Sequence, residues 1–592
     1  MAVHVIQGIP VSTGVALGRA YFLNRGRARN IPRQNIPDRD VEDELQRMDQ
    51  AFSQALAELE DIQGRVPAEL LEHARIIDSH IMMLQDPKLL ESAKTYIRNM
   101  QLNAEWALEK AVADIETVFR SIEDAYIRER IQDVRLVAGR VQQHLLGESG
   151  NSLRSINTRI ILLAHDLSPA DTVELEVGKI MAFATVTGGK TSHTGILARA
   201  MQIPAIVGAA DLEESIQDGQ LIIIDGLQGR IIVEPDEEEL ASFTDLKYQF
   251  EEYQAGINRS SHLPAETIDG YRVKVFANIE LLEEVSSVLG NGGEGVGLYR
   301  TEYSYLNRLK LPDEEQLLEE YQDLASIMFP SKVVLRTLDV GADKFMNHFG
   351  SLDEANPALG LRAVRFCLHH MDLFRVQLRA ILRASVHENI SLMFPMVSGL
   401  GELRQVKSVL NSVRMELKRE GVKYNPEMPV GIMIELPSAM ITADILATEV
   451  DFFSIGTNDL IQYSLGIDRT NSFVSYLYQP LHPALVRMIK YVVDAGHRAG
   501  IEVSICGEMA ADPYCIPVLM GMQVDCLSMN PQAVPVIKHI IRQATMEECK
   551  ALLKDVLASK TVGRNNKLVK DSIFRRHPSE LMFYSSLLDE GY

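Results

Sequence analysis

The second half of the chain repeats one pattern, a short apolar run followed by a helical segment, and this repeat limits the fold more than any other feature. We find eight such runs, which read RVKVFANI, GEGVGLYR, KVVLRTLDVG, ISLMFPMV, MPVGIMIELP, VDFFSIGTNDL, EVSICGEMA and DCLSMN. Eight β/α units over about 300 residues are typical of a (β/α)8 TIM barrel. The sequence therefore predicts a barrel over residues 268–560, followed by a C-terminal tail of residues 561–592.

Side chains that can bind ligands or take part in catalysis stand at the ends of these runs. In chain order they are Arg300, Arg336, Asp339, Glu435, Asn458, Asp459 and Cys506. Because the carboxyl ends of barrel strands meet at one mouth, residues spread over 200 positions of sequence can share one pocket. We therefore expect the active site at the barrel mouth.

The residue types at these positions suggest an anionic substrate and a metal. Arg300, Arg336 and Arg469 are candidate clamps for phosphate and carboxylate groups, and Arg362 in NPALGLR is a further candidate. Glu435 and Asp459 offer hard oxygen ligands that suit Mg²⁺. Salt bridges between these carboxylates and the arginines are the alternative. The position of Cys506 leaves a catalytic thiol and a buried apolar thiol equally open.

In the first half, the stretch GGKTSHTGILARA at residues 188–200 contains a Gly-Lys-Thr triplet and, two residues later, a histidine. A nucleotide-binding Walker A loop would need its first glycine at position 184, where the chain has Ala. A histidine among glycines and hydroxyl groups at the start of an apolar helix suits a neutral nucleophile, whose phosphorylated product the helix N–H groups can hold. We therefore predict that His193 accepts a phosphoryl group, with simple capping or packing as the alternative.

Changes in the spacing of apolar residues along the sequence divide the chain into predicted domains. Residues 1–25 and 147–233 share short β-rich runs and are predicted to form one α/β domain. Between them, residues 26–146 carry apolar side chains at helical spacing and are predicted to form an inserted bundle. The polar, charged segment 234–267 has a helical middle and is interpreted as the linker to the barrel.

Composition excludes several classes of protein. The formal net charge of -22 disfavours nucleic acid and anionic membranes as partners, and no apolar run approaches the roughly 20 residues of a membrane helix. The first 20 residues lack the pattern of a secretory signal, so a cytoplasmic protein is expected. The five cysteines lack CxxC spacing, which disfavours a disulfide framework or a zinc site.

Eight stretches, spread over the chain from end to end, match one known family: IQGIPVSTGVALGRA, GGKTSHTGILARA, GVGLYRTE, RTLDVGADK, NPALGLRA, MIELPSA, DFFSIGTNDLIQY and SICGEMAAD. On these stretches the chain resembles enzyme I of the bacterial phosphoenolpyruvate:sugar phosphotransferase system. The resemblance implies a phosphohistidine α/β domain with an inserted helical bundle, followed by a phosphoenolpyruvate-binding TIM barrel that carries the interface of a homodimer.

The resemblance also implies a role for each candidate residue. His193 would take the phosphoryl group from phosphoenolpyruvate and pass it to a histidine of the carrier HPr, docked on the helical insertion. Glu435 and Asp459 would bind Mg²⁺, and Cys506 would protonate the enolate to give pyruvate. The substrate would be held by Arg300, Arg336, Asn458, Asp459 and Arg469.

Three features depart from the family pattern. The chain reads Val340-Gly-Ala-Asp-Lys344 where the family usually has Ile-Gly-Gly-Asp-Lys, and Thr457-Asn-Asp-Leu-Ile461 where it has Thr at the last position. Neither change removes a candidate catalytic group. The tail after about Lys560 extends beyond the usual family ending, and the sequence indicates no chemical role for it.

Related functions remain as alternatives. Pyruvate phosphate dikinase and phosphoenolpyruvate synthase resemble the same domains but need a large ATP-binding domain, for which we find no residues. A nitrogen-regulatory paralogue of enzyme I usually has an extra N-terminal sensory domain, which we do not expect here. A non-catalytic regulatory homologue is disfavoured by the presence of His193, Glu435, Asp459 and Cys506.

Overall fold

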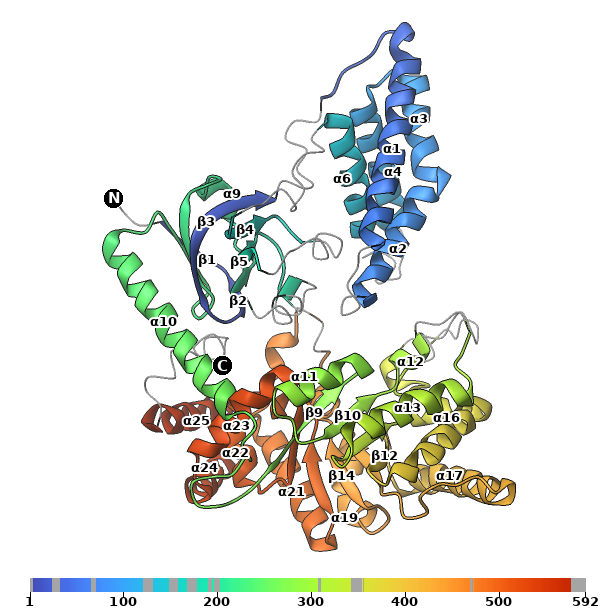
Figure 1. The fold of residues 1–592 in the computed structure, drawn as a ribbon, viewed down its shortest axis with the longest axis vertical. Coiled ribbons are helices and arrows are strands. Elements are labelled where there is room, and N and C mark those ends of the chain that lie inside the picture. Colours follow the sequence, from blue (N-terminus) through green and yellow to red (C-terminus); the bar gives the residue numbers. More distant parts are fainter. Residues whose placement is uncertain are drawn as a thin grey trace. The chain divides into compact units, whose positions relative to one another are not determined.

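The structure is a computed structural model (Figure 1). It describes residues 4–23, 32–64, 71–120, 131–147, 158–167, 178–189, 194–195, 198, 203–306, 310–341, 354, 356–468, 471 and 473–576. The chain divides into two compact units, the first comprising residues 1–251 and the second beginning at Glu252. Each unit is described by itself.

The first unit contains an eight-stranded sheet in the order β1-β8-β7-β3-β4-β5-β6-β2. Its strands are β1 His4–Gln7, β2 Ile9–Ser12, β3 Val15–Leu23, β4 Ile160–Ala164, β5 Ile180–Thr185, β6 Ala205–Val207, β7 Leu221–Asp225 and β8 Arg230–Val233. Strand β3 pairs in parallel with β4 and antiparallel with β7. The chain therefore leaves the sheet after β3 and returns beside it at β4, which confirms an α/β domain with an inserted segment.

Apolar side chains explain why the middle of this sheet is buried on both faces. All five residues of β4 are buried, as expected for a strand with parallel neighbours on a covered sheet. The odd and even positions of β4 enter separate apolar clusters, because successive side chains of a strand point to opposite faces. This packing fixes the carboxyl ends of β4 and β5, and β5 precedes His193 in the sequence.

The inserted segment forms a helical bundle of α1 Val41–Gln63, α2 Leu71–Gln85, α3 Pro87–Met100, α4 Ala104–Arg120 and α6 Ile131–Leu146 (Figure 1). Helix α1 buries Leu45, Met48, Phe52 and Leu59, spaced three, four and seven residues apart on one face. The Asp86 side chain caps α3 by accepting a hydrogen bond from the N–H of Lys88 at 2.9 Å. The bundle thus has its own apolar core.

Two further helices complete the description of this part of the chain. Helix α9 spans Leu212–Ser215, and the long helix α10 spans Glu237–Ser260 within the predicted linker. Ile257 is the buried residue of α10, so most of this helix is exposed to some degree. The division between the two units falls inside α10.

The second unit contains a closed barrel of eight parallel strands, in which β9 pairs with both β10 and β16. Its strands are β9 Lys274–Ile279, β10 Val296–Arg300, β11 Val333–Arg336, β12 Ile390–Phe394, β13 Val430–Ile434, β14 Phe452–Ile455, β15 Glu502–Ile505 and β16 Cys526–Met529. Each of the eight predicted runs contains one of these strands. The predicted TIM barrel is therefore confirmed.

Helices cover the outside of the strands (Figure 1). They are α11 Val285–Gly290, α12 Tyr303–Leu306, α13 Glu314–Met328, α15 Val364–His369, α16 Met371–Ala384, α17 Leu400–Glu420, α18 Pro437–Ile441, α19 Ala443–Leu446, α20 Thr457–Leu465, α21 Pro483–Ala499, α22 Ile516–Gly521, α23 Val534–Gln543 and α24 Met546–Ala558. Their apolar faces and the strands form one large core. Among the described residues, none of the helices has the length and apolarity needed to cross a membrane.

The beginning of the C-terminal tail is a helix, α25, over Val562–Arg576. Asn565 and Val569 are fully buried on this helix, and the Asn565 side-chain amide donates to the carbonyl of Leu481 at 2.8 Å. The described part of the tail therefore packs on the barrel.

Candidate active site

Four of the predicted residues lie at or directly after the carboxyl ends of barrel strands. Arg300 and Arg336 are the last residues of β10 and β11, while Glu435 and Cys506 directly follow β13 and β15. Asp459 and Asn458 were expected at the end of β14, but they lie in the first turn of α20, which follows that strand. Because these ends meet at one mouth, the fold brings the candidate residues toward a common region.

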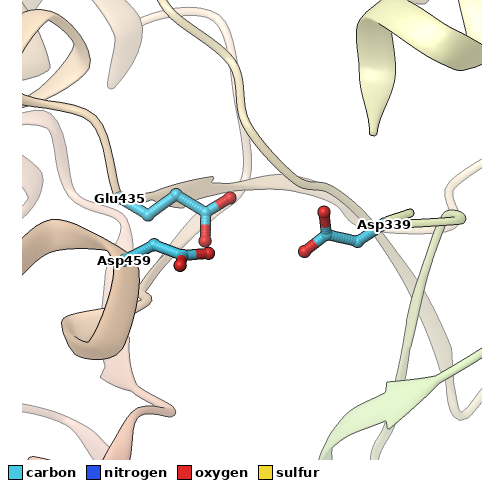
Figure 2. A group of neighbouring side chains, drawn as sticks. All are labelled: Asp339, Glu435 and Asp459. Atoms are coloured by element: carbon cyan, nitrogen blue, oxygen red, sulfur yellow. The ribbon is translucent and has the colours of Figure 1, made fainter. Parts of the chain in front are cut away.

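Three carboxylates face one another at this mouth. Asp339, Glu435 and Asp459 each offer an oxygen atom, and these atoms lie within 4.8 Å of one another. Figure 2 shows Glu435 and Asp459 side by side, with Asp339 pointing toward them from the other side. Carboxylates this close repel one another unless protons, arginines or a cation compensate their charge.

Two arginines supply part of that compensation. The Nη1 of Arg336 lies 2.9 Å from Asp339 Oδ2, and its Nη2 lies 2.9 Å from Glu302 Oε1. Arg362 bridges two members of the carboxylate group, with Nε 2.9 Å from Asp339 Oδ1 and Nη2 2.9 Å from Asp459 Oδ2. Salt bridges and a cluster of converging carboxylates are thus both present at the same site.

Glu435 is the carboxylate with the least compensation. It is 1% exposed, and its Oε1 accepts a hydrogen bond from the N–H of Met396 at 2.6 Å. Burial, followed by the neighbouring charges of Asp339 and Asp459, raises the pKa of Glu435 to about 8. Without a further cation, Glu435 therefore holds a proton near neutral pH.

Asp339 behaves in the opposite way. Although burial alone would raise its pKa, the positive charges of Arg336 and Arg362 hold the pKa of Asp339 below its usual value. Asp339 thus stays ionised and belongs with the arginines, while Glu435 is the group whose charge depends on what else is bound.

Glycine provides the space in which the Glu435 carboxylate sits. A Cβ atom at Gly456 would lie 2.7 Å from Glu435 Oε2, too close for any real contact. The residue after β14 must therefore be small for the carboxylate to reach the mouth. The three carboxylates fit a hard divalent cation, because such ions take carboxylate oxygens as ligands. The charge of the cation would also favour an ionised Glu435.

Cys506 lies in the apolar interior of the barrel next to this acidic region. The residue is 4% exposed, and its Sγ lies 3.6 Å from the carbonyl oxygen of Ile455, to which the thiol donates. Burial raises the pKa of Cys506 to about 11. The sequence left two roles open for Cys506, a catalytic thiol and a buried apolar thiol. The structure has features of both, because the thiol is buried and is a protonated donor at neutral pH.

Two other candidates have partners outside the carboxylate cluster. Arg300 forms an ion pair with Glu280. The Asn458 side chain spans to the loop after β15, where its Oδ1 accepts from the N–H of Glu508 at 2.8 Å and its Nδ2 donates to Glu508 Oε1 at 3.2 Å. Arg300 is at the end of β10 and Asn458 is in the first turn of α20, and the hydrogen bonds and ion pair described for them do not involve Glu435.

Four residues named in the sequence analysis lie outside the described part of the chain, and one residue of the site was not predicted from the sequence. His193, Arg469, Ala342 and Lys344 lie outside the described residues. The missed residue is Glu302, a 6% exposed carboxylate two positions after β10 that binds Arg336 and also accepts from the N–H of Asp339 at 2.7 Å. A charged residue so near a strand end in GVGLYRTE was the available signal.

Known protein families agree with this architecture. Three family models match the chain: the N-terminal domain of phosphoenolpyruvate-utilising enzymes over residues 7–130, their mobile domain over residues 156–229, and their phosphoenolpyruvate-binding domain over residues 254–546. The third match spans the barrel and every member of the carboxylate and arginine cluster. Fold, site and family models together define a phosphoenolpyruvate-utilising enzyme.

Full-length relatives narrow this class further. The phosphoenolpyruvate-protein phosphotransferase of Priestia megaterium is 40% identical over 568 residues, which is 96% of this chain and 99% of the relative. That of Geobacillus stearothermophilus is 40% identical over 95% of this chain and 97% of its own. That of Listeria monocytogenes is 38% identical over 95% and 98%. The chain therefore belongs to the phosphoenolpyruvate-protein phosphotransferase family, and the resemblance to enzyme I is confirmed.

Proposed function

We propose that this protein transfers the phosphoryl group of phosphoenolpyruvate to its own His193 and then to a histidine of the carrier HPr, releasing pyruvate. The observation that carries this proposal is the group of carboxylates and arginines at the mouth of a barrel that matches the phosphoenolpyruvate-binding domain. Phosphoenolpyruvate presents a phosphate and a carboxylate on a short carbon frame. Guanidinium groups match both of these geometries.

The arginines bind and orient the substrate. Arg300, Arg336, Arg362 and Arg469 are proposed to hold its phosphate and carboxylate, together with Asn458. Phosphoryl transfer depends mainly on in-line placement and on neutralising the charge of the moving group. Arg336 is already fixed by Glu302 and Asp339, so its donors need little reorganisation when the substrate arrives.

Glu435 and Asp459 are proposed to hold Mg²⁺, which the converging oxygens of the site support. When bound, the ion supplies positive charge next to the phosphate oxygens of the substrate. The chain's own contribution is to hold both carboxylates close together, while the charge of the ion would favour an ionised Glu435 and would compete with Arg362 for Asp459.

Cys506 is proposed to donate a proton to the enolate that remains after transfer. The C–H bond forms at the terminal carbon, the thiol becomes a thiolate, and the product is pyruvate. A thiol with a pKa of about 11 is fully protonated at neutral pH and therefore ready to act as an acid.

The partners belong to the same proposal. HPr is expected to dock on the helical insertion of residues 26–146, and the barrel is expected to carry a homodimer interface. The exposed apolar side chains of Ile441, Ile445 and Tyr491, on the adjoining helices α18, α19 and α21, are a candidate surface for that dimer. A cytoplasmic location and the division at residues 234–267 remain part of the proposal.

Labelling with ³²P-phosphoenolpyruvate and Mg²⁺ tests the function directly. We expect one acid-labile, base-stable phosphate on His193, as for a phosphoramidate, and its transfer to added HPr. Full labelling of His193→Ala would contradict the assignment. Comparing HPr with the carrier of a nitrogen-regulatory system as acceptors would separate the two branches of the family.

A further inference from the structure

The residues after β5, which precede His193 in sequence, are hydrogen-bonded to the end of β4 and the residue after it. The N–H of Val186 donates to the carbonyl of Ala164 at 3.1 Å. Both the N–H and the hydroxyl of Thr187 then donate to the carbonyl of His165, each at 3.0 Å. The parallel pairing of β4 and β5 thus continues past the ends of both strands.

A further hydrogen bond to the residues after β4 comes from Thr194, which follows His193 in sequence. Thr194 is 1% exposed, and its hydroxyl donates to Asp166 Oδ1 at 3.2 Å. The same Oδ1 accepts from the N–H of Leu167 at 2.9 Å, which orients the carboxylate toward the loop. The described residues Thr187 and Thr194, which lie on either side of His193 in sequence, therefore bind the adjacent residues His165 and Asp166.

We propose that Asp166 is a positioning residue for phosphoryl transfer, acting through the Thr194 hydroxyl on the adjoining His193. This inference rests on the function proposed above. Transfer requires the attacking nitrogen to stand in line with the phosphorus, and small misplacements of such a group cost large factors in rate. A hydrogen bond to a charged acceptor is stronger than one between neutral groups, so a carboxylate is well suited to hold this point.

A purely structural role is disfavoured by where these residues lie. Asp166 is exposed, and the sheet beneath it owes its stability to two apolar clusters that do not include it. What the contact between Asp166 and Thr194 determines is the path of the chain on the carboxyl side of His193.

The test uses single-turnover phosphorylation of the full chain by ³²P-phosphoenolpyruvate. We expect Asp166→Ala and Thr194→Val each to slow phosphorylation of His193 by about 10- to 100-fold. The double variant should be no slower than the slower single variant, because both changes remove the same contact. Asp166→Asn and Thr194→Ser, which keep an acceptor and a donor, should each lose less rate than the variant that removes the contact.

Two further measurements separate positioning from general damage. The Kd of phosphoenolpyruvate should be unchanged in every variant, because its proposed binding residues are all in the barrel. Asp218→Ala is the matched control: Asp218 is also an exposed aspartate of the sheet domain, and its Oδ1 accepts the N–H of Phe22 at 2.9 Å. This control should keep the wild-type rate.

The outcomes are distinct. Unchanged rates in Asp166→Ala and Thr194→Val, additive losses in the double variant, or an equal loss in Asp218→Ala would each overturn the inference. Thr194→Val conserves the volume of the side chain, so it tests the proposal even if Asp166→Ala does not fold. Failure of the wild-type protein to accept label would instead overturn the proposed function.

Discussion

Arg362 is the residue that links the two acidic groups of the site, since its guanidinium binds both Asp339 and Asp459. Its Nη1 also lies 3.3 Å from the hydroxyl of Tyr463, which in turn donates to the carbonyl of Ala358 at 2.6 Å. A divalent cation that uses Asp459 must therefore compete with Arg362 for the same carboxylate.

This competition predicts opposite effects of Arg362→Gln on two ligands. Without the guanidinium, Asp459 is free for the cation, and Mn²⁺ should bind the substrate-free protein roughly tenfold more tightly. Phosphoenolpyruvate should bind more weakly, because one of its proposed clamps is gone. Calorimetric titration with each ligand measures both effects.

Arg365→Gln is the control for that experiment. It removes the same charge three residues away, where Arg365 pairs with Glu402 at 3.0 Å rather than with the cluster. Its Mn²⁺ affinity should stay at the wild-type value. Equal tightening in both variants would mean that only the net charge of the region matters.

Glu435 makes cation binding depend on pH. Its pKa of about 8 lies above the usual value for a glutamic acid, so below pH 8 a cation must displace a proton to use this carboxylate. Mg²⁺ affinity should therefore rise between pH 6 and pH 8, by up to about tenfold per pH unit, and level off above pH 8.

Calorimetry in buffers of different ionisation enthalpy measures this proton release directly. Glu435→Gln should bind Mg²⁺ weakly with little change between pH 6 and pH 8. A wild-type affinity that is flat over this range would show that Glu435 is not the titrating ligand.

Cys506 should be dispensable for binding but not for turnover. In Cys506→Ala we expect the Kd of phosphoenolpyruvate to stay unchanged and pyruvate formation to slow by about 100-fold or more, since a general acid contributes at least that much. Because the thiol has a pKa of about 11, the wild-type rate should show no ionisation of Cys506 between pH 6 and pH 9. Unchanged pyruvate formation in the variant would reduce Cys506 to a packing residue.

At the scale of elements, the sequence predicts where several barrel strands end, because these strands are short apolar runs that stop at an arginine, a glutamate or a cysteine. Arg300, Arg336, Glu435 and Cys506 could be found in this way. The partners of these residues could not, because they depend on the paths of the loops. An isolated bridge between Gly341 and Arg362, for example, brings the arginine beside the loop after β11.

The helical bundle is an element that the sheet does not need for its core. Strands β3 and β4 are parallel neighbours, so their connection must cross over, but about a dozen residues are enough for this. Replacing residues 36–146 with a flexible linker of about 20 residues should preserve the sheet. The shortened protein should still be labelled by phosphoenolpyruvate yet fail to pass the label to HPr.

Labelling followed by incubation with HPr measures both steps in one experiment. The wild-type chain is the control and should complete both. Transfer to HPr by the shortened protein would contradict docking on the bundle.

At the scale of the whole molecule, the two compact units predict a separation of the two reactions. A fragment of residues 1–255 contains the bundle, the sheet and their own apolar cores, and should fold alone. It should exchange phosphate between His193 and phosphorylated HPr but not accept it from phosphoenolpyruvate, because the arginines and carboxylates of the barrel are absent. Self-labelling of this fragment by phosphoenolpyruvate would place the substrate site outside the barrel.

The sheet of the first unit joins strands from both ends of a long stretch of chain. Gln7 at the end of β1 donates to the carbonyl of Gln228, 221 residues further along, at 3.1 Å. During synthesis at about 5–20 residues per second, β1 must wait roughly 10–45 seconds for its partner strand to be made. The bundle, made in between, can finish folding first. The segment that is translated earliest is thus among the last to reach its final structure, and its strands keep unpaired backbone N–H and C=O groups in the nascent chain until their partners arrive.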